Sequence, residues 1–144
     1  MTSLPRLENI ISMFQTTPKS LRLQLLLEFS RKVPALPVEL KDNDHLERVH
    51  ECQTPFFLMA NVVDDKVHLF FDAPEDAPTT RGFAGILYEG LEGESYEAIL
   101  NLPMDFYEAL ELRELISPLR LRGMEGILFR LKRQVKERLV KNAS

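Results

Sequence analysis

Cysteine is almost missing from this chain of 144 residues, since Cys52 is the only one. One cysteine excludes an intrachain disulfide. With three histidines it also leaves too few ligands for the four-ligand zinc sites that stabilise small domains. No apolar run reaches the roughly 18 residues that a transmembrane helix needs, so we expect no membrane association. Positive charge is not in surplus, because 18 Lys and Arg stand against 22 Asp and Glu, and this argues against a nucleic-acid partner.

What the chain does contain is an ordinary globular composition, with 44% apolar and 28% charged residues. Such a composition and length predict one domain over residues 1–144, built around a single core. Glu8 interrupts the start of the chain, so no long uncharged segment of a secretory signal is present. We therefore expect a cytoplasmic protein.

The net charge of −4 is unevenly distributed along the chain. Acidic residues dominate segment 72–114, whereas basic residues dominate segment 118–144. Two interpretations remain open: the basic segment pairs with acids inside the fold, or it presents a surface to an acidic partner.

Two helices are predicted at the start of the chain. Residues 4–14 carry apolar side chains at helical spacing. Thr17 is expected to cap the second helix, with Pro18 at its first position. That helix, residues 18–32, has leucines around much of its circumference, which predicts that it is mostly buried.

A β-hairpin is predicted next. Residues 56–63 and 66–71 are rich in strand-forming residues, and Asp64 and Asp65 separate them as a two-residue turn. A further strand is expected at residues 46–51. Together these segments predict a small antiparallel sheet of about three strands.

The remainder reads as helical. Helices are expected at 79–91, after Ser95 as a cap, over 103–112, and from Pro118 to near the end with Ser117 as its cap. The order of elements predicts an α+β fold in which helices cover one face of the small sheet.

Cys52 falls in a polar connection between the expected strand 46–51 and the hairpin. A lone cysteine is more often inert and buried than reactive, but loops on a rigid scaffold often carry function. Arg48 and His50 would share a face with the thiol in a strand and favour its thiolate, whereas Glu51 would oppose ionisation. The sequence does not decide which effect is larger, nor whether the thiol is buried or exposed at rest.

A single thiol suits a carrier of persulfide sulfur. A second thiol nearby would attack Cys–S–SH, close a disulfide and release the sulfur. A cysteine protease would need His and Asn or Asp partners, and an Fe–S scaffold would need several thiolates. Neither set is evident in the sequence.

Three segments resemble the SufE family, the cysteine desulfuration proteins. Residues 49–55 (VHECQTP) resemble the family's segment around its active cysteine, residues 76–82 (DAPTTRG) its Asp-Ala motif with a basic residue and Gly, and residues 117–124 (SPLRLRGM) the opening of its final helix. The motifs occur in the family's order, and the resemblance covers a core of about residues 10–138. The sequence departs from the family at Glu51, where many members have Gly, and at Arg122, where a neutral amide is usual.

The resemblance implies a SufE/IscU-like α+β fold and a role as sulfur acceptor. Members of the family take persulfide sulfur from a SufS-type cysteine desulfurase, stimulate that enzyme, and deliver the sulfur to an Fe–S scaffold of the SufBCD type. Pyridoxal phosphate belongs to the desulfurase, so we expect no cofactor and no metal on this chain. Such a protein is a carrier and partner rather than a stand-alone enzyme.

Carried over by position, Cys52 is the sulfur acceptor. Gln53 either hydrogen-bonds near the sulfur or shapes the turn. Arg120 either forms an ion pair with Asp76, the interpretation we favour, or meets the partner. The expected supporting or partner-binding residues are His50, Glu51, Gln53, Asp76, Arg81, Arg120 and Arg122.

Two alternative functions remain open at this level. In the first, the chain docks on and activates a desulfurase without carrying sulfur. In the second, it is an independent thiol oxidoreductase that needs no desulfurase.

Overall fold

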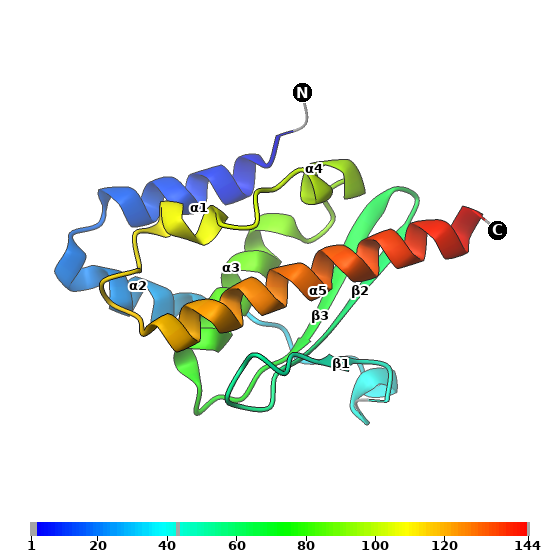
Figure 1. The fold of residues 1–144 in the computed structure, drawn as a ribbon, viewed down its shortest axis with the longest axis horizontal. Helices are drawn as coiled ribbons and strands as arrows, with labels where there is room; N and C mark the ends of the chain where they lie inside the picture. The colour runs from blue at the N-terminus through cyan, green and yellow to red at the C-terminus, as the bar shows by residue number, and fades with distance from the viewer. Residues whose placement is uncertain (1–2, 43, 144) are drawn as a thin grey trace.

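A computed structural model describes residues 3–42 and 44–143; Met1, Thr2, Ser144 and Asn43, which falls in the expected polar loop at 41–44, lie outside the described residues. The elements are α1 (Pro5–Thr16), α2 (Lys19–Ser30), η1 (Val38–Leu40), β1 (Glu47–Arg48), β2 (Phe57–Val63), β3 (Lys66–Asp72), α3 (Pro78–Leu91), α4 (Tyr96–Leu100), η2 (Phe106–Leu110) and α5 (Pro118–Ala143). Helices α1 and α2 pack on α3, and α5 runs the length of the molecule across β2 (Figure 1).

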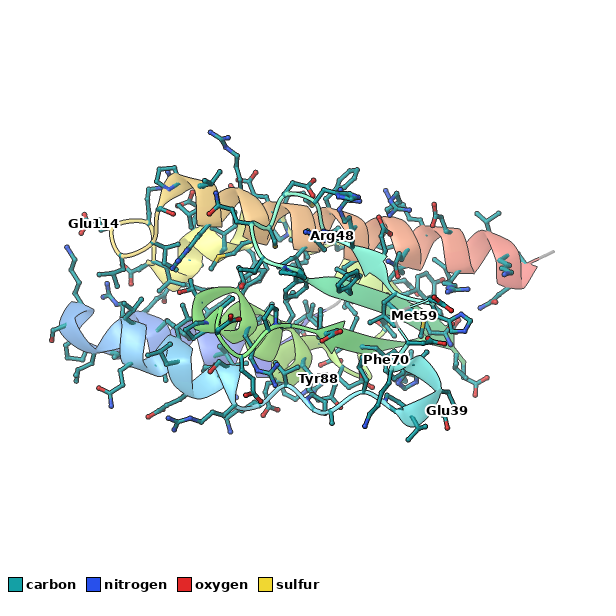
Figure 2. All side chains as sticks on the ribbon, turned by 90° about the horizontal axis from the view of Figure 1, so that it is seen from below. Glu39, Arg48, Met59, Phe70, Tyr88 and Glu114 are labelled. Atoms are coloured by element: carbon teal, nitrogen blue, oxygen red, sulfur yellow. The ribbon has the colours of Figure 1, made fainter. Side chains whose placement is uncertain are left out.

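The sheet has three antiparallel strands in the order β1-β2-β3, which confirms the predicted α+β class. Asp64 and Asp65 form the hairpin turn with φ of 52° and 66°. Two consecutive positive φ values match the right-handed twist of the strands, as in a type I′ turn. Met59 and Phe70 pair across the hairpin on the half-buried face, opposite the face that packs on α5 (Figure 2).

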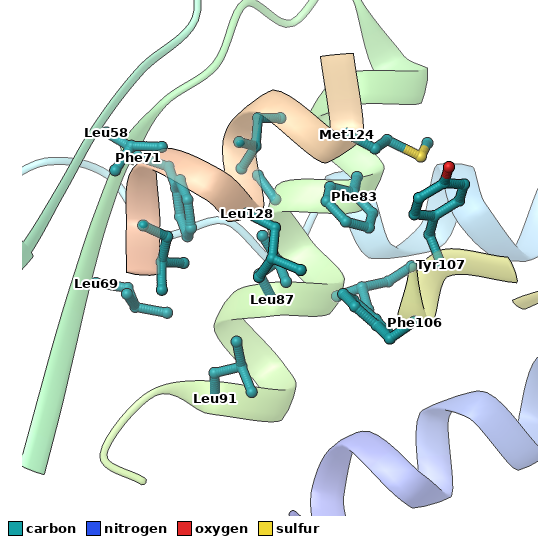
Figure 3. Packing of buried hydrophobic residues seen from close by; sticks show 14 of the residues in the cluster. Leu58, Leu69, Phe71, Phe83, Leu87, Leu91, Phe106, Tyr107, Met124 and Leu128 are labelled. Carbon is teal, nitrogen blue, oxygen red and sulfur yellow. The ribbon is translucent and has the colours of Figure 1, made fainter. Parts of the chain in front are cut away.

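The core lies between the covered face of the sheet, α3 and α5. Phe83 and Leu87 of α3 point toward Leu128 of α5, with Leu69 and Phe71 of β3 beside them (Figure 3). Since alternate residues of β2 and β3 are buried, each strand contributes one face to this core, as the alternation in the sequence requires.

Glycine brings α2 and α3 into close contact. A Cβ at Gly82 would lie 2.5 Å from the carbonyl oxygen of Leu26, and one at Gly85 only 1.9 Å from that of Phe29. The two backbones therefore approach more closely than any side chain would allow. Leu26 and Phe29 are the buried residues of α2.

Two expectations about α2 are wrong. Thr17 does not cap it: the Thr17 hydroxyl donates to the carbonyl of Met13 in α1, and Pro18 stands at the N-cap position. The helix is also not mostly buried, because α3 covers only one of its faces. Leu21, Leu23 and Leu27 are exposed.

Two other elements are shorter than expected. The strand at 46–51 is reduced to Glu47–Arg48, because the chain turns at His50. The helix expected over 103–112 is only the 3-10 turn Phe106–Leu110, and it ends at Glu111 with a left-handed φ of 56°. The other predicted helices are present, and Ser95 caps α4 by accepting from the Ala98 N–H. In the part of the chain that the structure describes, no helix is long and apolar enough to span a membrane.

Candidate functional site: the Cys52 pocket

The Cys52 loop, residues 49–56, connects β1 to β2 in a tight turn. The Val49 N–H donates to the Phe56 carbonyl at 2.8 Å and closes the base of the loop. The Cys52 N–H donates back to the Val49 carbonyl at 3.1 Å. Val49 and Phe56 are fully buried, so the base is anchored in the core while the tip reaches α5.

The Cys52 side chain points inward and is only 5% exposed. Its Sγ lies 3.9 Å from the Gly123 carbonyl oxygen of α5. A Cβ at Gly123 would lie 3.3 Å from this sulfur, closer than ordinary van der Waals contact. The glycine therefore makes room for the thiol, and the loop rests closed against the helix.

A pocket of about 90 Å³ opens beside Cys52. Its walls are the tip of the Cys52 loop, the loop that precedes α3, and the first turns of α3 and α5. The starts of α3 and α5 carry a partial positive charge that favours an anion, whereas the carboxylates of Glu51 and Asp76 oppose one. The pocket thus has room for a small group bound to the sulfur, between groups of both signs.

The closed loop keeps the thiol protonated. Burial, and next the charge of Glu51, raise the pKa of Cys52 to about 11, and the positive charge of Arg130 offsets this only in part. The balance that the sequence left open between ionising and opposing neighbours is therefore resolved in favour of the neutral thiol at rest. His50 is exposed and does not contribute to this shift.

Glu51 is paired with Arg130, a residue absent from the predicted site. Glu51 Oε1 accepts from Arg130 Nε at 3.1 Å and from Nη2 at 2.9 Å. Burial alone would raise the pKa of Glu51, but hydrogen bonds and charge, chiefly from Arg130, lower it below its usual value. Gly123, Gly126 and Arg130 share one helix face at spacings of three and four residues. The spacing shows that these residues share a side of the helix, but nothing in the sequence shows that this side faces Glu51.

The expected buried ion pair between Arg120 and Asp76 is not present. Both residues line the pocket and are exposed, but within the described ranges no nitrogen of Arg120 lies within 4.0 Å of the Asp76 carboxylate. Instead, Arg120 Nη1 donates to the Thr79 hydroxyl at 3.2 Å. The contact still joins the start of α5 to the start of α3, because Thr79 lies three residues after Asp76.

The other predicted residues fall into two groups. Gln53 lines the pocket beside Cys52 and is exposed. Arg81 lies outside the pocket, where its Nε donates to the Ser30 carbonyl at 2.9 Å and its Nη1 to the Ala73 carbonyl. Arg122 is exposed and makes no ion pair with any described residue. The structure therefore gathers Glu51, Cys52, Gln53, Asp76 and Arg120 around one pocket, and leaves His50, Arg81 and Arg122 outside it.

A metal centre is not assembled around the pocket. Over residues 3–42 and 44–143, no three His, Cys, Asp or Glu side chains come together in a way that would hold a metal ion.

Comparison with known proteins identifies the fold and the family. The family model for SufE, described as an Fe-S metabolism associated domain, matches residues 8–135. A SufE-like protein of Mycobacterium tuberculosis is 48% identical over 137 residues, which cover 94% of this chain and 95% of that protein. The solution structure of a hypothetical protein from Thermus thermophilus is 50% identical, with a TM-score of 0.85 over 96% of this chain and 99% of that chain.

A more distant relative carries a functional name. The protein named cysteine desulfuration protein SufE in Plasmodium vivax is 26% identical over 132 residues, which are 89% of this chain and 52% of that protein. The family match spans both walls of the Cys52 pocket, from the loop after β1 to the first turns of α5. The chain belongs to the SufE family, whose domain is associated with Fe–S metabolism.

Proposed function

We propose that this protein is a sulfur acceptor that takes persulfide sulfur from a SufS-type cysteine desulfurase onto Cys52. Family membership supports a role in Fe–S metabolism related to cysteine desulfuration. The observation that carries the finer proposal is the Cys52 loop, where the chain's single cysteine lies on a short turn beside its own pocket.

The transfer is an exchange between sulfur atoms. The Cys52 thiol gives its proton to water and attacks, as thiolate, the terminal sulfur of the partner's cysteine persulfide. A new S–S bond forms at Cys52, the S–S bond of the partner breaks, and the partner's cysteine leaves as a thiolate. Sulfur changes carrier without net oxidation, so the step needs no electron acceptor.

The pocket suits the product of this transfer. A volume of about 90 Å³ exceeds what one water molecule occupies, so one additional sulfur atom fits beside Sγ. The starts of α3 and α5 would stabilise the negative charge of a persulfide. Within the chain no other thiol is present to attack the persulfide and release its sulfur.

The partners follow from this role. Pyridoxal phosphate acts on the desulfurase, and this chain contributes a thiol without a cofactor of its own. Removing the sulfur from the desulfurase frees that enzyme for another turnover, so the protein stimulates it. The sulfur then passes to a SufBCD-type scaffold in the cytoplasm, with no nucleic acid or membrane involved.

The test is the intact mass of the protein after incubation with a SufS-type desulfurase and cysteine. The wild type is expected to gain about one sulfur atom, which a reducing agent removes, and Cys52→Ser to gain none. Ser20→Ala serves as a control, because it makes a similarly small change at an exposed residue of α2 that does not line the pocket. No gain on the wild type would overturn sulfur transfer.

The two alternatives give different results in the same reactions. A docking activator would raise desulfurase turnover equally as wild type and as Cys52→Ser. An independent thiol oxidoreductase would need a resolving thiol from another molecule, because Cys52 is the only cysteine of the chain. Turnover of peroxide or of a disulfide by the isolated protein, without a desulfurase, would favour that alternative over sulfur transfer.

A further inference from the structure

Arg130 is fixed by two carboxylates at once. Besides its two hydrogen bonds to Glu51, its Nη1 donates to Glu47 Oε2 at 2.6 Å. Glu47 is itself bound by Arg133 and by the Nε2 of Gln134, at 3.0 Å for the latter. The guanidinium is therefore held by Glu47 independently of its contact with Glu51.

The tip of the Cys52 loop lies on two glycines of α5. Gly123 lies under Cys52, and Gly126 lies under Glu51. A Cβ at Gly126 would come within 2.8 to 3.0 Å of the Cβ, Cγ and Cδ atoms of Glu51. Consequently the glutamate side chain lies flat on the helix, with its carboxylate directed at Arg130 one turn further on.

In its closed position the Cys52 loop keeps reaction partners away from the sulfur atom. An attacking thiolate must approach its partner in line, and a side chain that is 5% exposed leaves no such path. The tip of the loop has to leave α5 before Cys52 can react. That movement carries Glu51 away with it and breaks its two hydrogen bonds to Arg130.

We propose that Arg130 is a positioning residue for Cys52: through the Glu51 carboxylate it holds the loop against α5 and sets how often the thiol is exposed. The proposal rests on the proposed function only in taking Cys52 as the reacting residue. It assigns a purpose to Glu51, because a residue without a carboxylate at this position would leave Arg130 without its hydrogen bonds to the loop.

Several charged groups face the thiol, so the test must separate charge from position. His50 and Glu51 precede Cys52 on its own loop, Asp76 lies in the loop before α3, and α5 contributes Arg120 and Arg130. As a charge, Arg130 favours the thiolate, and its loss would slow the reactions of Cys52. As a holder of the loop, its loss would speed them. The two roles predict opposite signs.

The experiment measures the rate at which iodoacetamide alkylates Cys52 in the isolated full chain, from neutral to mildly alkaline pH. Arg130→Gln is expected to react about five-fold faster than the wild type at each pH. This corresponds to about 1 kcal/mol, the upper range for a partly exposed ion pair. Arg130→Lys keeps the charge but loses the two-point contact, and is expected in between. A slower Arg130→Gln would overturn the proposal.

Gly126→Ala tests the same idea without changing any charge. The added methyl group must displace Glu51, so Cys52 is expected to react faster. Alanine also favours a helix over glycine, so the melting temperature is not expected to fall. Faster alkylation in a protein of equal or greater stability cannot come from general unfolding. An unchanged rate in Gly126→Ala would overturn the proposal.

Arg138→Gln is the matched control. Arg138 lies on the same helix two turns later and makes no ion pair with a described residue. Cys52 in Arg138→Gln is therefore expected to be alkylated at the same rate as in the wild type. A rise as large as that of Arg130→Gln would show that any lost charge on α5 loosens the loop, and would overturn the proposal. Alkylation needs no desulfurase. Faster alkylation with no sulfur gained by the wild type would leave the role of Arg130 standing and refute sulfur transfer.

Discussion

The Sγ atom of Cys52 lies 3.9 Å from the carbonyl oxygen of Gly123, in the second turn of the longest helix of the structure. The contact joins a loop tip to the helix that spans the sheet, and it buries the only thiol of the chain. The resting protein therefore protects its sulfur from solvent. Reactivity has to be gained by a change in the loop rather than by ionisation in place.

The buried thiol predicts a specific dependence of stability on pH. The pKa of Cys52 is raised from 9.0 to about 11 in the folded protein, first by burial and then by Glu51. Below about pH 9 the thiol is protonated in both states, so this contribution is fully present. As pH rises from about 9 to about 11, the unfolded state loses the proton first, and about 2 kcal/mol of stability is lost.

Urea denaturation of the wild type and of Cys52→Ser at a series of pH values measures this loss. The free energy of unfolding of the wild type is expected to fall more steeply above pH 9 than that of Cys52→Ser. Comparing the two proteins removes the contribution of Tyr107, whose pKa is also raised, to about 12, by burial and by its hydrogen bond to Glu125. Parallel curves would contradict a buried, protonated thiol.

Gln134 predicts a large effect of one amide on stability. It is buried, its Oε1 accepts from the Ala60 N–H at 2.7 Å, and its Nε2 donates to Glu47. Gln134→Leu keeps the size of the side chain but leaves the Ala60 N–H without an acceptor, which costs about 2 kcal/mol. Chemical denaturation measures the loss. Gln24→Leu on the exposed face of α2 is the control, and an equal change in both variants would refute the role of Gln134.

Arg81 is predicted to act on stability, through two backbone carbonyls. Its guanidinium joins α3 to Ser30 at the end of α2 and to Ala73 after β3. Arg81→Met keeps the aliphatic stem but leaves both carbonyls without a charged donor, and is expected to lower the free energy of unfolding by about 2 kcal/mol. Arg31→Met, at an exposed residue nearby, is expected to change it by less than about 0.5 kcal/mol.

Local patterns in the sequence predicted the hairpin and most helices, because each depends on neighbouring residues. The turn at Asp64 and Asp65, the cap at Ser95 and the start of α5 at Pro118 all follow from local chemistry. The exposure of α2 did not follow. A helix with leucines on several faces does not reveal that its neighbours will bury only the side that carries Leu26 and Phe29.

The sequence predicted several of the residues that line the pocket, but not the hydrogen bonds that these residues form. Resemblance to a family identified Cys52, Asp76 and Arg120, and the structure brings all three to one pocket. Which donor pairs with which acceptor is decided only when segments far apart in the chain pack to within hydrogen-bonding distance. Hence Arg120 meets Thr79 rather than Asp76, and Glu51 meets Arg130 from 79 residues away.

The crossing of α2 and α3 gives a last prediction. Replacing Gly85 of α3 by alanine is expected to lower the free energy of unfolding more than replacing Gly90 of the same helix. A Cβ at Gly85 would lie 1.9 Å from the Phe29 carbonyl oxygen, which is rigid backbone, so the two helices must separate. A Cβ at Gly90 would lie 3.0 to 3.2 Å from Cδ1, Cβ and Cα of Leu7, so α1 needs to move by only a few tenths of an ångström. Overpacking of this kind costs about 3 kcal/mol where the neighbour cannot move, and less where it can.

Thermal and urea denaturation of Gly85→Ala and Gly90→Ala measure the difference. Alanine gains the same helix propensity at both positions, about 1 kcal/mol, so that term cancels in the comparison. Gly85→Ala is expected to be the less stable variant by about 2 kcal/mol. Equal stability of the two variants would mean that α2 can shift on α3 to make room for the added methyl group. The Ser30 carbonyl, which follows Phe29 and accepts from Arg81 of α3, would then not hold α2 in place.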